Sequence, residues 1–195
     1  RVPLDMGGSI MSGIMAHPLD RLRRYLGLEE RPVKVYEVFQ MLGEVELDVV
    51  ERLGLDVLPV EPPVQFFGLR RERYKPWSLW DGTEVLVPGD FAVSTDTDGS
   101  LLLREGGASV GPVAARMPAN GYYFDMRSMT SFDPSYKPPT IESLRDDNLL
   151  SEEDIEFMRR RAKRLRGETD KALFLGAWGA FGLPAVGSLP DFLCL

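Results

Sequence analysis

A glutamate directly after a short apolar run is the residue in this sequence best placed for acid–base chemistry. Residues 55–60 (LDVLPV) are typical of a buried strand, and the run ends at Glu61-Pro62-Pro63, which a strand interior does not accept. In parallel α/β folds, functional groups gather where strands end and loops begin. Glu61 is therefore the candidate catalytic residue, a general acid or base. The alternative is a solvated carboxylate at the start of a loop.

The only histidine and the only cysteine offer two further reactive groups. An imidazole can bind a substrate or exchange a proton, so His17 is a candidate substrate-binding residue; the alternative is a residue at the start of a helix, next to Pro18. Cys194 as a nucleophile would need His17 as its partner, and burial as a small apolar side chain is the favoured interpretation. One cysteine also excludes an internal disulfide framework and a cysteine-based zinc site.

A glycine-rich segment follows a second apolar run. Residues 171–175 are expected to form a core strand, and residues 176–182 (GAWGAFG) the loop at its carboxyl end. Trp178 and Phe181 in this loop are candidate substrate-binding residues, as walls of a pocket. No metal ligand is assigned within this chain.

Arginines cluster in two places. Arg21, Arg23 and Arg24, near Asp5, could hold an anionic substrate, since guanidinium groups pair well with carboxylates. A solvated helix face is the favoured interpretation, both there and for the basic run over residues 159–166.

Helix and strand signals alternate along the chain. The spacing of apolar residues predicts helices over residues 18–28, 35–53 and 151–167, ended by glycines at positions 27, 54 and 167. Ser151 is the expected N-cap of the last helix, with Asp154 in a capping-box position. Two helix-then-strand units, which end in strands 55–60 and 171–175, favour an α/β fold with parallel strands.

Residues 64–135 have a different character. Short β-prone runs alternate with turn signals such as Asp81-Gly82 and Asp98-Gly99, the strongest short signal of a β-hairpin. We expect an antiparallel hairpin layer here, as a β-rich insertion. It carries several aromatic residues (Trp77, Trp80, Phe91, Tyr122, Tyr123, Phe124). They are expected to anchor the layer; a pocket wall is the alternative.

Composition limits the class of protein. The chain has 195 residues, 44% of them hydrophobic, and a net charge of −7, which is ordinary for a globular protein and argues against a nucleic-acid binder. Glycines and prolines interrupt the apolar stretch 172–195, so no membrane span is predicted. No basic-then-apolar leader follows Arg1, and a cytoplasmic protein is expected. The start at Arg1 and the apolar end at Leu195 predict a fragment.

The order of these segments resembles the amino-terminal half of the uroporphyrinogen decarboxylase superfamily, in particular its cobalamin-linked methyltransferase branch. The similar segments are RVPLD (1–5), LRRYLGL (22–28), VVERLGLDVLPV (49–60), WSLWDGTEVLVP (77–88), MPANGYYFD (117–125) and ALFLGAWGAFG (172–182). The resemblance implies a (β/α)8 TIM barrel with its site at the carboxyl ends of the strands. Because such barrels take about 250 residues, residues 1–195 are expected to be the amino-terminal part of one barrel domain, a partial TIM barrel with residues 64–135 inserted.

The resemblance also implies a reaction. Methyltransferases of this branch move a methyl group between a small substrate and a corrinoid protein, and their zinc ligands lie in the second half, outside this chain. Glu61 matches the position of the catalytic aspartate of the decarboxylases. Their substrate motif RQAGRY has no counterpart, because residues 5–17 contain no arginine.

Corrinoid-dependent methyl transfer is therefore the expected function, with a small methyl donor as substrate and a corrinoid protein as partner. A homodimer is compatible with the resemblance, and no nucleic acid or membrane is expected as a partner. Two alternatives stay open: decarboxylation of a porphyrinogen in tetrapyrrole biosynthesis, and a non-catalytic binding module of the same fold. The fragment alone is expected to be inactive and, through its unpaired strand edges, to aggregate.

Overall fold

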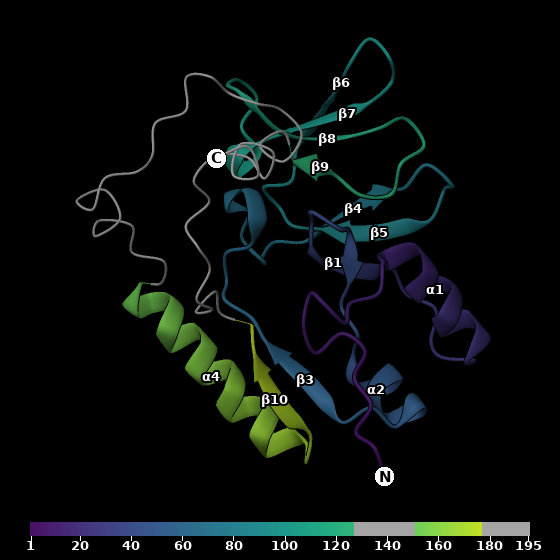
Figure 1. Cartoon of the computed structure of the whole chain (residues 1–195), viewed down its shortest axis with the longest axis vertical. Helices are drawn as coiled ribbons and strands as arrows, with labels where there is room; N and C mark the ends of the chain where they lie inside the picture. Colours follow the sequence, from purple (N-terminus) through teal and green to yellow (C-terminus); the bar gives the residue numbers. More distant parts are fainter. Residues whose placement is uncertain (127–150, 177–195) are drawn as a thin grey trace, which may run out of the picture.

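A computed structural model describes residues 1–126 and 151–176 of the chain (Figure 1). Within them the protein is a mixed α/β structure with three sheets and few helices. The helices and strands are α1 (Ala16–Tyr25), β1 (Val33–Glu37), β2 (Leu42–Gly43), α2 (Leu47–Leu53), β3 (Val57–Val60), β4 (Lys75–Ser78), β5 (Glu84–Val87), β6 (Val93–Thr95), β7 (Leu101–Arg104), β8 (Val113–Met117), β9 (Asp125–Met126), α4 (Glu152–Glu168) and β10 (Ala172–Leu175). These two stretches do not form a closed barrel.

Two parallel strands form the sheet that carries the candidate site. β3 and β10 pair in register, from Ala172 opposite Val57 to Leu175 opposite Val60. Helix α4 precedes β10 in the chain and lies alongside both strands (Figure 1). The strands predicted over residues 55–60 and 171–175, and their parallel arrangement, are confirmed.

Local signals define the start of α4 as predicted. The Ser151 hydroxyl accepts the Asp154 N–H at 3.1 Å, and the Asp154 carboxylate accepts the Ser151 N–H at 3.2 Å, which completes a capping box. The helix continues to Glu168, so Gly167 lies inside the last turn. The prediction that Gly167 ends the helix is wrong, because the chain keeps helical backbone until Thr169.

Replacing Ser151 with alanine removes the acceptor for the Asp154 N–H. We expect the free energy of unfolding, measured by urea denaturation, to fall by about 1 kcal/mol. Ser151→Asp keeps an oxygen acceptor at the N-cap and serves as the control, with an expected urea midpoint close to that of the wild type. Equal midpoints for Ser151→Ala and the wild type would contradict the prediction.

The helix predicted over residues 35–53 is wrong in its first half. Residues 33–37 form β1, which pairs in parallel with β5, Val33 lying opposite Val85. Residues 42–43 form β2, antiparallel to β1. The segment VKVYE begins with β-branched residues at alternate positions, so its apolar residues suit a strand as well as a helix. The hydrogen bonds to β5, a strand distant in sequence, decide between the two.

A tight turn separates β1 from β2. The Glu37 carboxylate accepts the N–H groups of Phe39 and Gln40, which holds the chain in the turn. Only residues 47–53 of the predicted helix are helical, as α2, and Gly54 ends it in the left-handed conformation as predicted. The helix predicted over residues 18–28 is α1, followed by Gly27 at a φ of 68°.

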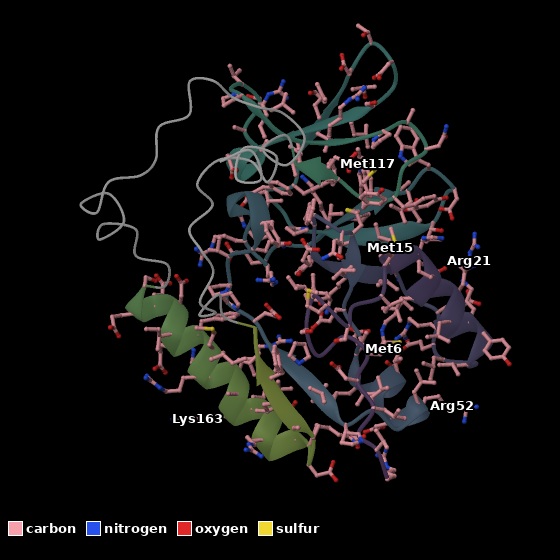
Figure 2. All side chains as sticks on the ribbon, viewed as in Figure 1. Met6, Met15, Arg21, Arg52, Met117 and Lys163 are labelled. Atoms are coloured by element: carbon pink, nitrogen blue, oxygen red, sulfur yellow. The ribbon has the colours of Figure 1, made fainter. Side chains whose placement is uncertain are left out.

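The hairpin layer predicted over residues 64–135 is antiparallel within its described part. The turn at Asp81-Gly82 joins β4 to β5, and the turn at Asp98-Gly99 joins β6 to β7. The order of the second sheet is β6-β7-β8-β9, and Met117 of β8, labelled in Figure 2, is fully buried. Because β5 also pairs with β1, backbone hydrogen bonds join this layer to the amino-terminal strands.

Aromatic side chains anchor the hairpin layer, as predicted for three of them. The ring of Trp77 lies edge-on 5.3 Å from that of Phe91, and Phe91 lies 6.2 Å from Phe124. Phe91 and Phe124 are buried, whereas Trp80 and Tyr123 are exposed. The buried rings therefore hold the β4–β5 hairpin against the β6–β9 sheet.

Candidate active site

Glu61 lies at the carboxyl end of β3, as predicted, and is only 7% exposed. The alternative of a solvated loop carboxylate is therefore wrong. Carboxylate atom Oε2 lies 3.7 Å from Nη2 of Arg71. Two prolines follow, Pro62 and Pro63, and their fixed φ angles restrict the backbone that leaves the strand. The end of β3 thus holds a carboxylate inside the protein beside one guanidinium.

Gly176 brings the end of β10 against the same carboxylate. Its N–H donates to the Val60 carbonyl at 3.0 Å, which continues the pairing of β10 with β3 by one residue. A Cβ atom at position 176 would overlap the carboxylate of Glu61. Any other residue at position 176 would therefore displace the Glu61 carboxylate from its present position.

Main-chain carbonyls fix the position of Arg71. Its Nε donates to the Tyr36 carbonyl at 2.8 Å, and its Nη1 donates to the carbonyls of Pro62 and Val64. The guanidinium also lies over the Tyr36 ring, 5.9 Å from its centre. These contacts leave Nη2 directed toward Glu61 and tie the loop after β3 to strand β1.

Burial dominates the electrostatics of the Glu61–Arg71 pair. The pKa of Glu61 is raised because burial disfavours the charged carboxylate, and Arg71 and then Arg161 offset part of this. The pKa of Arg71 is lowered, again chiefly by burial, with Glu61 the main opposing influence. Both pKa shifts indicate that burial costs the two charged side chains more free energy than their mutual attraction recovers. Glu61 therefore holds its proton to a higher pH than a free glutamate does.

A cavity of about 300 Å³ lies beside this pair. Its wall includes Tyr36 of β1, Tyr74, and Arg161 of α4, together with Glu61 and Arg71. Burial raises the pKa of Tyr74 to about 12 and that of Tyr36 well above its usual range, with the nearby Glu61 charge adding to the Tyr36 shift. Both phenols therefore keep their protons and can donate hydrogen bonds in the cavity.

A second cavity of about 190 Å³ also has Glu61 and Arg71 in its wall. The rest of that wall is more apolar and includes Phe174 of β10. Gln65 lines it as well, and its Oε1 atom accepts the Val38 N–H at 2.7 Å. The carboxylate thus borders one polar space and one largely apolar space, an arrangement that suits a group acting on a bound substrate.

Sequence reasoning did not identify Arg71, Tyr36, Tyr74 or Arg161 as site residues. For Arg161 the prediction of a solvated face is wrong: the side chain pairs with Glu44 at 3.3 Å and lines the larger cavity. Helical spacing is the signal that could have identified Arg161. Arg161 follows the buried Met158 by three residues, so the two share a face of α4.

The structure does not bring His17, the other predicted site residue that it describes, to Glu61. His17 lies in α1 and stacks on Tyr122, the ring centres 4.4 Å apart, and neither cavity that borders Glu61 includes it. Trp178 and Phe181 lie outside the described residues, as does Cys194.

The arginines of α1 form ion pairs within the protein. Arg23 is only 3% exposed, so its predicted solvated position is wrong: Nη1 and Nη2 contact the Asp48 carboxylate at 3.0 and 2.8 Å. Arg21 and Arg24 pair with other aspartates. Figure 2 shows Arg21 of α1 and Lys163 of α4 on opposite sides of the molecule, so the two basic clusters do not form one patch.

Comparison of the chain with protein-family models, curated proteins and solved structures found no match. In the part of the chain that the structure describes, no group of three or more His, Cys, Asp or Glu side chains is arranged to hold a metal ion. None of the helices described is long and apolar enough to cross a membrane. The chemistry around Glu61 is therefore the best guide to function.

Proposed function

We propose that the chain is the amino-terminal part of an enzyme in which Glu61 exchanges a proton with a small substrate. The observation that carries this proposal is a buried carboxyl group with a raised pKa, at the end of a parallel strand and on the wall of a cavity. Such groups concentrate at functional sites, because proton transfer needs a donor whose pKa is matched to the reaction.

The proposed reaction is methyl transfer between a small substrate and a corrinoid protein in the cytoplasm. It rests on the resemblance to the methyltransferase-like branch of the uroporphyrinogen decarboxylase superfamily. The parallel β3–β10 pair with α4 alongside is compatible with one unit of a (β/α)8 barrel, the proposed fold of the complete protein. A corrinoid carried by the partner protein would supply the acceptor for the methyl group, and any zinc would use ligands outside this chain.

Glu61 would act on the substrate side of this reaction. When the bond between the methyl carbon and a substrate heteroatom breaks, its electron pair stays on the heteroatom. The protonated Glu61 carboxyl can give that atom a proton, and water can reprotonate Glu61 after the product leaves. The raised pKa supports this role because it increases the protonated fraction of Glu61 at any given pH.

The size of the cavity favours a small substrate over a porphyrinogen. Its volume of about 300 Å³ lies at the lower end of the roughly 300–1,000 Å³ found for ligand sites, whereas a porphyrinogen has four rings and several carboxylates. Residues 5–17 also offer no arginine to bind those carboxylates. A non-catalytic binding module is disfavoured because Glu61 is buried on a cavity wall, at a cost in desolvation.

The test is to express the complete reading frame and follow two reactions. Methyl transfer from methylated alcohols, amines and thiols to cob(I)alamin is followed by absorbance, and release of CO₂ is measured with uroporphyrinogen. We expect methyl transfer from one of these donors and no CO₂. Release of CO₂ without methyl transfer would establish the decarboxylase alternative. Neither reaction, with no binding of a corrinoid protein, would refute the enzymatic proposal.

A further inference from the structure

Three residues on the wall of the larger cavity each carry a buried side-chain polar atom that has no hydrogen-bond partner among the described residues. These atoms are the hydroxyl oxygen of Tyr36, Oε1 of Glu61 and Nε of Arg161. Tyr36 is 5% exposed and Glu61 7%. Because native proteins satisfy nearly all buried polar groups, a partner supplied from outside these residues is expected in the cavity.

The three atoms need partners of different kinds. The Glu61 carboxyl can accept a hydrogen bond from an N–H or O–H donor, and it keeps an acceptor oxygen when it is protonated. The Arg161 Nε–H only donates, so it needs an acceptor, and the protonated Tyr36 hydroxyl can donate to the same acceptor. One ligand would satisfy all three if it carried an anionic oxygen at one end and a hydrogen-bond donor at the other.

The charge of the lining favours an anionic group near Arg161. The charged side chains on the wall are four cations, Lys34, Arg71, Arg161 and Arg164, against two carboxylates, Glu44 and Glu61. Glu44 contacts Arg161 at 3.3 Å and Lys34 at 3.7 Å, and Lys34 also lies 3.5 Å from Glu46, which is not part of this wall. A ligand carboxylate would give Arg161 a second anionic partner at this end of the cavity.

The cavity is larger than bridging waters require. One water takes about 30 Å³ of the liquid, whereas the cavity measures about 300 Å³, enough for a molecule of several heavy atoms. We infer that it binds a small amino-carboxylate, with the carboxylate against Arg161 and Tyr36 and the N–H donors against Glu61. This inference rests on the proposed function and deepens it, because it names the class of substrate.

Calorimetric titration of the protein expressed from the complete reading frame tests the class of ligand. The probes are glycine, β-alanine and γ-aminobutyrate, which differ in length, beside acetate and methylammonium, each of which carries only one of the two groups. At constant ionic strength we expect at least one amino-carboxylate to bind about tenfold more tightly than acetate or methylammonium. If acetate binds as tightly as every amino-carboxylate, or if no probe binds, the inference is wrong.

Variants of the wall test the placement. Arg161→Met removes the guanidinium that would donate to the ligand carboxylate. Tyr36→Phe removes only the hydroxyl oxygen from a packed ring. Each substitution is expected to weaken amino-carboxylate binding about tenfold. Arg159→Met is the matched control, because Arg159 is exposed on the same helix and lines neither cavity that borders Glu61. Wild-type affinity in both wall variants would overturn the inference.

The binding experiment contains no corrinoid, so the two proposals fail separately. Tight amino-carboxylate binding without methyl transfer would refute the proposed reaction alone. Methyl transfer without amino-carboxylate binding would refute the proposed class of substrate alone.

Discussion

Glu61→Gln is expected to lower kcat for methyl transfer by roughly 10²–10⁴-fold, the usual contribution of a general acid or base. Glutamine keeps the shape of the side chain but carries no exchangeable acidic proton. The wild-type rate should fall as pH rises through the raised pKa of Glu61, because the proton donor is then lost. The residual rate of the variant should lack that descending limb, which a pH–rate profile of both proteins measures.

The same substitution has a second expected effect, on stability. A carboxyl whose pKa is raised by folding stabilises the protein below its unfolded pKa of about 4.3 and loses this contribution as pH rises through the folded pKa. Glu61→Gln should therefore be more stable than the wild type at neutral pH and should lose that advantage in acid. Thermal melts at several pH values measure the difference.

Glu72→Gln is the matched control for both effects. Glu72 lies on the surface and pairs only loosely with neighbouring arginines, so its neutral variant is expected to keep wild-type kcat and pH dependence. An unchanged kcat in Glu61→Gln would remove Glu61 from the chemistry, whatever its effect on stability.

Arg71→Met is expected to lower the free energy of unfolding at neutral pH by about 3 kcal/mol. The substitution takes hydrogen bonds from three main-chain carbonyls and leaves the Glu61 carboxylate buried without its neighbouring guanidinium. The loss should shrink toward acid pH, because protonation of Glu61 then removes the unpaired charge. Urea denaturation at neutral and acid pH measures both effects.

Arg70→Met provides the comparison for this variant. Arg70 is adjacent in the chain, but its side chain is 40% exposed and its ion pair is with the exposed Glu72, so the expected change is within about 0.5 kcal/mol. Equal effects at positions 70 and 71 would show that the buried contacts of Arg71 do not hold the loop after β3.

Elements defined by local signals were predictable, and those defined by distant pairing were not. The start of α4 follows from Ser151 and Asp154, which lie within one turn of each other. Residues 33–37 carry an apolar pattern that suits either a helix or a strand, and only pairing with β5 makes them β1. The parallel arrangement of β3 and β10 is the exception, because two helix-then-strand units in the sequence favour parallel strands although the pairing itself is distant.

The candidate site divides in the same way. The position of Glu61 directly after a strand identified it from sequence, because this placement has a general structural meaning. Arg71 could not be identified in this way, because its role depends on main-chain carbonyls of the loop after β3 and of Tyr36 in another strand. Tyr36 itself lies in the segment that was predicted to be a helix. A helix directs its side chains differently from a strand, so this prediction could not place Tyr36 at the site.

The overlap between a Cβ at Gly176 and the carboxylate of Glu61 makes the mutational histories of the two positions depend on each other. Gly176→Ala requires the buried Glu61 carboxylate to move, whereas Glu61→Asp, which shortens the side chain by one methylene, would draw the carboxylate back and open the space. A lineage would therefore acquire both substitutions at lower cost by changing position 61 first than by the opposite order. The absence of a side chain at Gly176, after β10, is therefore matched to the length of the Glu61 side chain, after β3.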